Sequence, residues 1–457
     1  MRLIAALGLL ALSTAALAQP TDPVRRKAER DLLEKIVEIP TVAGRGQMPR
    51  MTALLTAELK KAGISDIVVK SHDDTQTMIA RWHAAKPSSK KPILLMAHMD
   101  VVEAKASDWK YDPFVFRQEG GYYLGRGVND NKAGLAGIVL ALQDLKRAGF
   151  RPTRDIIVLF TGDEETTGNG ALRASTEWRP LIDAEYALNS DSGGGSLFKD
   201  GRVEGFFLQI AEKTYADYRF LAINRGGHSS APRPDNAIYQ LANALTAVEH
   251  YRFKPMINDA SRAMFERLGQ SDTGNYGELV RRWLKDPTDR EAADLVEAND
   301  LGKTRTRCVA TMLSGGHAPN ALPQRAEANV NCRIFPGVTP EAIRDELQAV
   351  AGQDVTVDIK DKPTYSAASP LRQDVLDAYA AAVATRIKDA PILPFMEAGA
   401  SDGAFTRAAG IPTYGVSSVW GYSGESDNIH GLNERVLIDG FHGQMPIWEE
   451  LIRRLAG

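Results

Sequence analysis

The sequence contains little cysteine or histidine and almost no net charge. Its 457 residues include 2 cysteines and 8 histidines, and 55 basic side chains nearly balance 58 acidic ones, for a formal net charge of -3. This balance excludes the strongly basic surface of a nucleic-acid-binding protein. No helix rich in lysine and arginine suggests a membrane surface. Apart from the N-terminus, no apolar run approaches the roughly 20 residues of a membrane span, so we expect neither partner for the mature chain.

The N-terminus is different in character. Arg2 precedes an apolar run over 3–12, and the small residues Ala16 and Ala18 flank Leu17 just before Gln19. A short apolar run followed by a small-residue cleavage site is typical of a secretory signal, and it disfavours the alternative of an N-terminal core helix. We therefore predict a signal peptide over 1–18 and a mature chain in an oxidising exported compartment, a bacterial periplasm.

The two cysteines lie in two strand-like segments. Cys308 falls within 306–313 and Cys332 within 328–335. If these segments pair as an antiparallel hairpin centred near Asn320, the cysteines face each other, and a disulfide then suits the compartment. Two buried free thiols are the alternative, and the sequence leaves this choice open.

The length and the order of the expected elements predict two domains. Over 19–213 and 362–457, strand-like runs alternate with amphipathic helices, which indicates an α/β fold with a mostly parallel mixed sheet flanked by helices. Over 214–361, the order strand-helix-strand-strand-helix-strand predicts an inserted α+β domain. We expect the glycine-rich segment 192–201 to be a flexible loop, and 255–304 to be a polar insertion.

Residue types that bind metals occur in five short segments, and four of these follow strand-like runs. Carboxyl ends of parallel strands gather at one edge of a sheet, where ligands bind. Imidazole nitrogen and carboxylate oxygen without thiolate are the ligands of a hydrolytic zinc or a similar ion. The residues are His98, Asp100, Asp130, Glu164, Glu165, Asp191 and His430.

Two of these segments carry more information than the others. The glycines at 125 and 127 allow a tight turn that could aim Asp130 into a cleft. The adjacent acids at 163–165 would by default be a solvated charge cluster, but they follow the buried strand expected at 156–160. Several carboxylates near the interior are costly unless cations neutralise them. A pair of divalent ions about 4 Å apart would do so, and this predicts a metallohydrolase.

Several motifs in a fixed order resemble the metallopeptidase-20 family, which includes carboxypeptidase S, glutamate carboxypeptidase, aminoacylase, dipeptidases and succinyl-diaminopimelate desuccinylase. The resemblance covers nearly the whole mature chain. Asp191 and the segment 109–114 look more like carboxypeptidase S, fatty N-acyl-amino-acid hydrolases and dipeptidases than like the desuccinylases. The matching motifs lie at 98–102, 109–114, 125–132, 163–165, 227–232, 315–323, 333–337 and His430.

The resemblance implies two divalent metal ions, with Zn²⁺ as the expected species. His98 and Asp191 would hold one ion, Glu165 and His430 would hold the other, and Asp130 would bridge the two.

The resemblance also implies catalytic roles for two acids. Asp100 would orient the ring of His98 from behind the metal ligands. Glu164 would be the general base that takes a proton from the attacking water and delivers it to the leaving amine.

The inserted domain resembles the family's lid and dimerisation module. His228 and Asn320 would contact the scissile carbonyl or its oxyanion, with His228 supplied by the partner of a homodimer. Arg333 would hold the substrate carboxylate, a task that suits its forked cation. Without the family context, His228 would be a turn histidine and Arg333 an exposed strand arginine.

These residues favour an exported zinc-dependent exopeptidase or amidohydrolase that cleaves short peptides, of carboxypeptidase or dipeptidase type. The alternative is an N-acyl-amino-acid hydrolase, which needs the same metals, base and carboxylate clamp. A catalytically inactive metal- or peptide-binding homologue is disfavoured because Glu164 and all five proposed ligands are present. A serine hydrolase is disfavoured because no Gly-x-Ser-x-Gly elbow is evident.

Overall fold

The structure is a computed structural model that describes residues 22–299 and 302–457. The predicted signal peptide over 1–18 lies outside these residues. Within them, no helix combines the length and the apolar character needed to cross a membrane.

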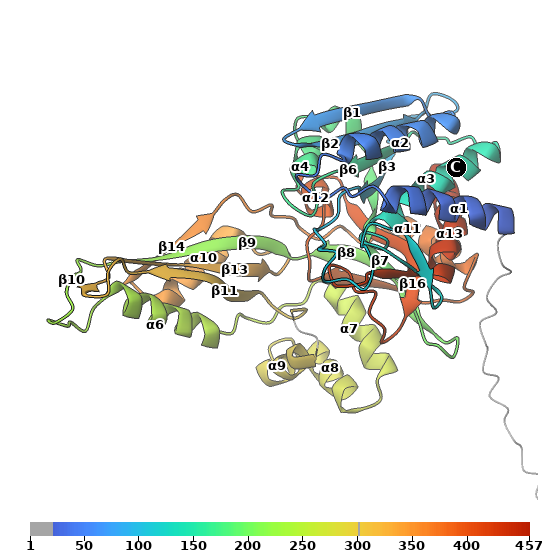
Figure 1. Ribbon diagram of the computed structural model, residues 1–457. Helices are drawn as coiled ribbons and strands as arrows, with labels where there is room; N and C mark the ends of the chain where they lie inside the picture. Colours follow the sequence, from blue (N-terminus) through green and yellow to red (C-terminus); the bar gives the residue numbers. More distant parts are fainter. Residues whose placement is uncertain (1–21, 300–301) are drawn as a thin grey trace, which may run out of the picture.

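The larger part of the molecule is built on one mixed sheet of eight strands (Figure 1). Strands β3 and β6 lie in its interior and are buried along their whole length, which explains their uninterrupted apolar sequences. Strand β3 runs parallel to both β6 and β7, and β7 runs parallel to β16. The strands in sheet order are β1 (Asp66–His72), β2 (Thr75–Trp82), β6 (Ile156–Thr161), β3 (Ile93–His98), β7 (Tyr186–Leu197), β16 (Thr413–Tyr422), β8 (Val203–Glu212) and β15 (Ile392–Glu397).

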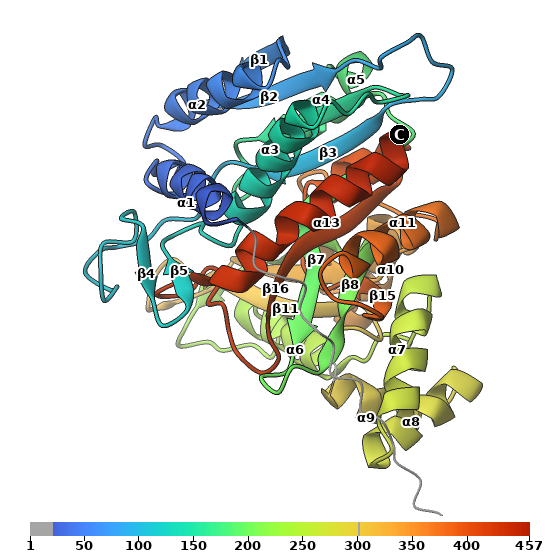
Figure 2. The same cartoon turned by 90° about the vertical axis from the view of Figure 1, so that its right-hand side faces the viewer.

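Helices cover both faces of this sheet, as the alternation of strands and helices predicts (Figure 2). The larger core lies under α1 (Pro23–Val37), α2 (Met48–Lys61), α3 (Lys132–Arg147), α11 (Gln373–Ala384) and α13 (Ile438–Ala456). The opposite face carries α4 (Asn169–Ser175), α5 (Arg179–Ile182) and α12 (Gly403–Ala408). The α/β class with a mostly parallel sheet is therefore confirmed.

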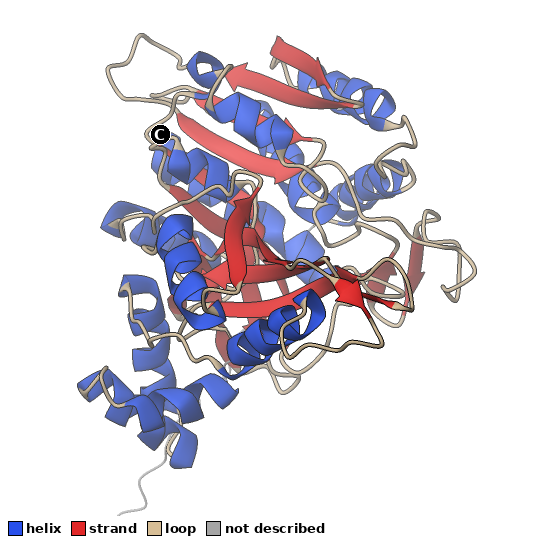
Figure 3. Ribbon diagram, turned by 90° about the vertical axis from the view of Figure 1, so that its left-hand side faces the viewer, coloured by secondary structure: helices blue, strands red, loops and turns tan. Residues whose placement is uncertain are grey.

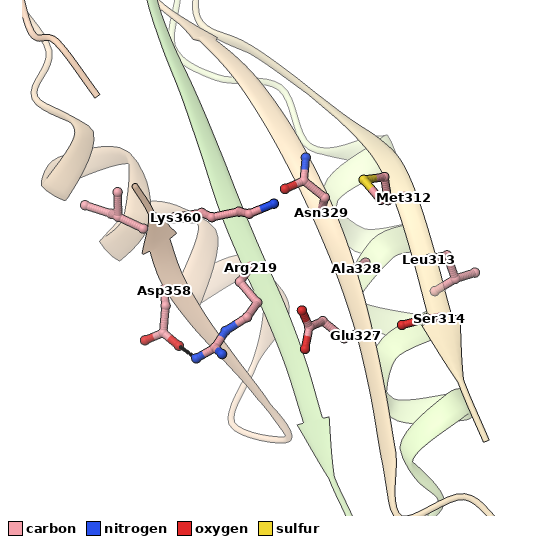
Figure 4. A pocket seen from close by; sticks show the side chains of 10 residues that line it. Arg219, Met312, Leu313, Ser314, Glu327, Ala328, Asn329, Asp358 and Lys360 are labelled. Atoms are coloured by element: carbon pink, nitrogen blue, oxygen red, sulfur yellow. Dashed lines mark hydrogen bonds and ion pairs between the residues drawn. The ribbon is translucent and has the colours of Figure 1, made fainter. Parts of the chain in front are cut away.

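A second, four-stranded antiparallel sheet extends away from the first (Figures 1 and 3). Its order is β11 (Arg307–Gly315), β13 (Arg325–Ile334), β9 (Thr214–Ile223) and β14 (Val355–Lys360). Helices α6 (Ala237–His250) and α10 (Pro340–Ala351) pack on one face and enclose a separate apolar core. The other face is open, and part of it appears in Figure 4, where Arg219 pairs with Asp358.

The second sheet also joins the two cysteines. Strands β11 and β13 pair antiparallel with Cys308 opposite Cys332, and the two sulfur atoms form a disulfide. The hairpin interpretation and the disulfide alternative are both confirmed.

The predicted polar insertion forms three helices with a small core of their own. They are α7 (Asp259–Ser271), α8 (Asn275–Lys285) and α9 (Arg290–Asn299). Helix α7 also packs along β15 at the edge of the large sheet. Part of the predicted insertion therefore packs against the large sheet, and the proposed domain boundaries at 213 and 362 stay a prediction.

The prediction of a flexible loop at 192–201 is wrong for most of that segment. Strand β7 continues to Leu197, pairing with β16 and then with β8. Gly193 and Gly194 have φ of 97° and 96°, and a Cβ on either would meet backbone oxygen at 2.6 and 2.8 Å. The glycines therefore permit a bent strand between two close neighbours rather than a loop.

Two small sheets complete the fold. One pairs β10 (Gly227–His228) with β12 (Ala321–Leu322), and the other orders β17 (Arg435–Leu437), β5 (Tyr122–Leu124) and β4 (Arg117–Glu119).

Candidate metal centre

The proposed metal-binding residues come from the ends of neighbouring strands and from the loops beside them. His98 is the last residue of β3, and Asp191 lies on β7, the neighbour of β3. Glu165 follows β6, on the other side of β3. Asp130 precedes α3, and His430 lies between β16 and β17. Parallel strand order thus gathers residues from distant parts of the chain, as expected for the carboxyl edge of such a sheet.

The side chains form two groups that share Asp130. The Nε2 atom of His98 lies 2.9 Å from Asp130 Oδ1 and 3.3 Å from Asp191 Oδ1. The Nε2 atom of His430 lies 2.9 Å from a Glu165 oxygen and 3.2 Å from Asp130 Oδ2. Within each group the potential ligand atoms lie within 4.8 Å of one another. Each oxygen of Asp130 therefore faces a different group, which is the arrangement of a bridging carboxylate.

The donor set fits divalent cations. It consists of imidazole nitrogen and carboxylate oxygen, the ligands that zinc takes in hydrolytic sites. Hydrogen bonds to Asp130 and Glu165 raise the pKa of His430 to about 10. Such a shift reflects an excess of negative charge, which cations would compensate.

Glu164, the proposed general base, lines the same cleft. Burial, together with the negative charge of Asp191, raises the pKa of Glu164 to about 11. A carboxyl in this position holds a proton readily, and bound cations would lower its pKa again. Its position beside the ligands suits a group that accepts and returns a proton.

Asp100 contacts two neighbouring segments at once. Its carboxylate accepts hydrogen bonds from the backbone N–H groups of Glu164 at 3.2 Å and Glu165 at 2.9 Å. The Nδ1 atom of His98 lies 3.1 Å from the backbone oxygen of Asp100 and 3.5 Å from its carboxylate. Asp100 therefore fixes the loop that carries the base and one ligand, in addition to facing the ring that the sequence assigned to it.

Glu434 is a residue of the centre that the sequence did not suggest. Its buried carboxylate accepts hydrogen bonds from the backbone N–H groups of Gly127 at 2.8 Å, Asn129 at 3.0 Å and Asp130 at 3.1 Å. The guanidinium of Arg126 donates to the same carboxylate at 2.8 Å. Because Glu434 lies four residues after His430, it ties the two ligand-bearing loops together. Its position four residues after His430 is the one sequence signal that could have suggested a role in the centre, since Glu434 belongs to no recognised motif.

Two further side chains were also missed. Asn131 donates from Nδ2 to Asp191 Oδ1 at 2.8 Å and accepts from Ser190 Oγ at 2.8 Å, so it orients a proposed ligand. Asp402 is buried and accepts a hydrogen bond from Thr161. Burial raises the pKa of Asp402 well above its usual range. Nothing in the sequence indicated that this acid is buried.

The backbone at His430 is itself unusual. Its φ is 58°, in the left-handed region that non-glycine residues rarely adopt. Asn428 and Asn433 on either side have φ of 56° and 57°. Conformations of this kind persist where the surroundings enforce them, and they cluster at functional sites.

The two groups open into a cleft of about 490 Å³. Among the described residues, its lining contains no lysine or arginine. The lining residues beyond the proposed ligands and base are Asn129, Asn131, Ser190, Ser192, Gly193, Gly194, Gly195, Glu397, Gly399, Ala400, Ser417, Val419, Trp420, Gly421, Asp427 and Ile429.

The three proposed substrate-binding residues do not line this cleft. His228 is exposed on β10, and the backbone oxygen of neighbouring Asn320 accepts from Ser229 at 3.0 Å. Strand β10 lies at the far end of the second sheet from β3 and β7 (Figure 1). Arg333 lies near the base of that sheet, with its guanidinium 4.7 Å from the ring centre of Tyr215. The structure therefore pairs His228 with Asn320, and brings neither of them to the metal ligands of the same chain.

The chain is similar to known proteins over most of its length. The family described as "Peptidase family M20/M25/M40" matches residues 94–454. The probable carboxypeptidase S-like 2 of Dictyostelium discoideum is 30% identical over 285 residues, which cover 61% of this chain and 54%, about half, of that protein. The N-fatty-acyl-amino acid synthase/hydrolase PM20D1.1 of Danio rerio is 24% identical over 449 residues, 94% of this chain and 86% of that protein.

Solved structures share the fold. The M20 family metallo-carboxypeptidase Sso-CP2 from Sulfolobus solfataricus matches with a TM-score of 0.69 at 18% identity, over 95% of this chain and 99% of that one.

Proposed function

The chain belongs to peptidase family M20/M25/M40, and we propose that it is a two-metal amide hydrolase whose product carries a free amino-acid carboxylate. The single observation that carries this proposal is the pair of ligand groups that share Asp130. Zn²⁺ is the proposed ion because the donors are imidazole and carboxylate. Short peptides are the proposed substrates, cleaved in the manner of a carboxypeptidase or dipeptidase.

The proposed chemistry depends on an acid–base group beside the ions. Divalent ions bound by the two groups would polarise the scissile carbonyl and make water a better nucleophile. Glu164 accepts a proton from the attacking water and returns it to the departing nitrogen. One carboxylate therefore serves as both base and acid, and it ends the reaction in its starting protonation state. Asp100 holds the backbone of Glu164 and therefore fixes the position of that carboxylate. A well-placed general base is worth about 10² to 10⁴ in rate.

Deacylation of N-acyl amino acids is the second candidate function. It uses the same ions, base and carboxylate clamp, and the Danio rerio relative is named for a reaction of this class. An inactive binding homologue is disfavoured, because the candidate base lies in the cleft beside both ligand groups.

We propose that a second copy of the chain completes the site. Strand β11 is an edge strand that is exposed along most of its length, with Met312 67% and Leu313 70% exposed (Figure 4). An exposed apolar edge strand is prepared to pair with another chain. In such a homodimer, His228 and Asn320 would be available to the partner's metal centre, and Arg333 would bind the substrate carboxylate when the lid closes.

We also propose export to the periplasm. The signal-like N-terminus supports this, and so does the Cys308–Cys332 disulfide, since such bonds persist in oxidising compartments. N-terminal sequencing of the protein from cell fractions should find a start near Gln19 in the periplasmic fraction.

The proposed function is tested by hydrolysis of a panel of dipeptides and N-acyl amino acids, with and without added zinc. Activity should require the metal. Glu164→Gln should keep both ions and lose about 10² to 10⁴ in rate. If the metal-loaded enzyme cleaves nothing in the panel, the substrate class is wrong. If Glu164→Gln retains full activity, Glu164 is not the base.

A further inference from the structure

The cleft contains more carboxylates than two metal ions and a base would use. Asp130, Asp191 and Glu165 are the proposed acidic ligands, and Glu164 is the proposed base. Two divalent ions would balance these four negative charges. Two further carboxylates line the cleft, Glu397 at the end of β15 and Asp427 after β16.

Neither of these two carboxylates forms an ion pair with another of the described residues. Among the described residues, the Glu397 carboxylate accepts one hydrogen bond, from the backbone N–H of Ala398 at 2.9 Å. The Asp427 carboxylate accepts from Asn129 Nδ2 at 3.2 Å. The guanidinium of Arg435 acts on Asp427 only by Coulomb attraction, because it pairs directly with Glu425. Negative charge in this half-buried cleft is therefore balanced only in part by the protein, and a cationic ligand would balance the rest.

The cleft is correspondingly poor in apolar surface. Its larger apolar side chains are Val419, Trp420 and Ile429. Val419 and Trp420 are only 9% and 3% exposed, so Ile429, which is 50% exposed, offers most of the apolar area that these three side chains present. A long acyl chain would lie against glycines, serines and carboxylates, and it would gain little from burial there.

Resting on the proposed function, we infer that Glu397 and Asp427 select substrates whose acyl half carries a positive charge. The substrate class is then peptides with a free amino terminus, rather than fatty or other N-acyl amino acids. An ammonium group beside a carboxylate gains Coulomb energy that a methyl group in the same place does not. This assigns the chain a different substrate preference from the one for which the Danio rerio relative is named.

The test compares two substrates that differ in one group, glycyl-leucine and propionyl-leucine. They have the same shape, with an ammonium in the first where the second has a methyl. The full zinc-loaded enzyme should show a kcat/KM at least about tenfold higher for glycyl-leucine. This preference should shrink as the ionic strength rises, because salt screens the interaction.

Glu397→Gln and Asp427→Asn identify the residues responsible. Each should raise KM for glycyl-leucine about five- to tenfold with little change in kcat. The reason is that the lost contact to the ammonium stabilises the bound substrate and the transition state equally. Hydrolysis of propionyl-leucine by the same variants should fall much less than that of glycyl-leucine, because propionyl-leucine has no ammonium. A zinc content and a Tm equal to those of the wild type show that the variants fold. The exposed Glu204→Gln is a matched control on β8 that should change neither substrate.

The outcomes distinguish a failure of the charge preference from a failure of the proposed function. Equal or faster hydrolysis of propionyl-leucine by the wild type would overturn the charge preference and leave the two-metal hydrolase intact. A wild-type preference that survives both substitutions would remove Glu397 and Asp427 as its cause. Cleavage of neither compound by the zinc-loaded enzyme would instead count against the proposed function.

Discussion

Replacing Glu434 with glutamine should weaken metal binding without touching a metal ligand. One oxygen of the Glu434 carboxylate accepts from Asn129 and Asp130, and the other accepts from Gly127 and Arg126. Glutamine keeps one oxygen and turns an NH₂ group toward two of these donors. Two hydrogen bonds to a charged acceptor are then lost, at about 1.5–3 kcal/mol each.

The expected cost to folding is about 3–5 kcal/mol, the range found when one partner of a buried ionic contact is removed. Because the loop of Asp130 and the loop of His430 are no longer fixed to each other, metal affinity should fall about 10- to 100-fold. Equilibrium denaturation measures the first effect, and titration of the metal-free protein with zinc measures the second. Glu425→Gln is the control, since its carboxylate lies in the same loop as His430 but binds Tyr122, Lys199 and Arg435.

The control should bind zinc as tightly as the wild type. A folded Glu434→Gln protein with unchanged zinc affinity would refute the reasoning, because the ligand geometry would then not depend on the clamp. A loss of stability alone, with normal affinity, would reduce Glu434 to a structural residue.

Two predictions concern stability. Replacing Cys308 and Cys332 by serine removes a cross-link between residues with a sequence separation of 24. This should lower the free energy of unfolding of the second sheet by about 3 kcal/mol, measured by denaturation under non-reducing conditions. An unchanged denaturation midpoint would contradict this. Burial alone would raise the pKa of Glu185, but hydrogen bonds from Arg154 and Arg372 lower it below its usual 4.5. The contribution of Glu185 is therefore present above about pH 4.5 and is lost as the pH falls through the lowered pKa. Glu185→Gln should lower Tm at pH 7, and the difference should shrink as the pH falls below 4.5; a constant difference would show that the charge of Glu185 plays no part.

The sequence predicts those parts of this molecule in which local pattern and tertiary structure agree. Helix α10 over 340–351 is an example, because a proline at its first position and a helical apolar face both favour a helix locally. The sequence could predict that the proposed metal ligands meet, because four of the five segments follow strand-like runs and parallel strands bring such ends together.

The missed parts depend on neighbours that the local sequence does not reveal. The glycine-rich continuation of β7 reads as a loop, yet β8 and β16 supply its hydrogen bonds on both sides. Glu434 looks like one more acid near the C-terminus, and its importance comes from backbone N–H groups about 300 residues earlier. The segment of helix α7 was predicted only as part of a polar insertion, because the strand β15 on which it packs comes more than a hundred residues later.

The most direct measurement is the metal content of the purified protein, together with that of two single variants. Elemental analysis after dialysis should find two divalent ions per chain, and His98→Ala and His430→Ala should each lose about one of them, since each histidine belongs to a different ligand group. Active wild-type protein with one ion or none would contradict the two-ion centre on which the proposed chemistry rests. An unchanged ion content in both variants would contradict it as well.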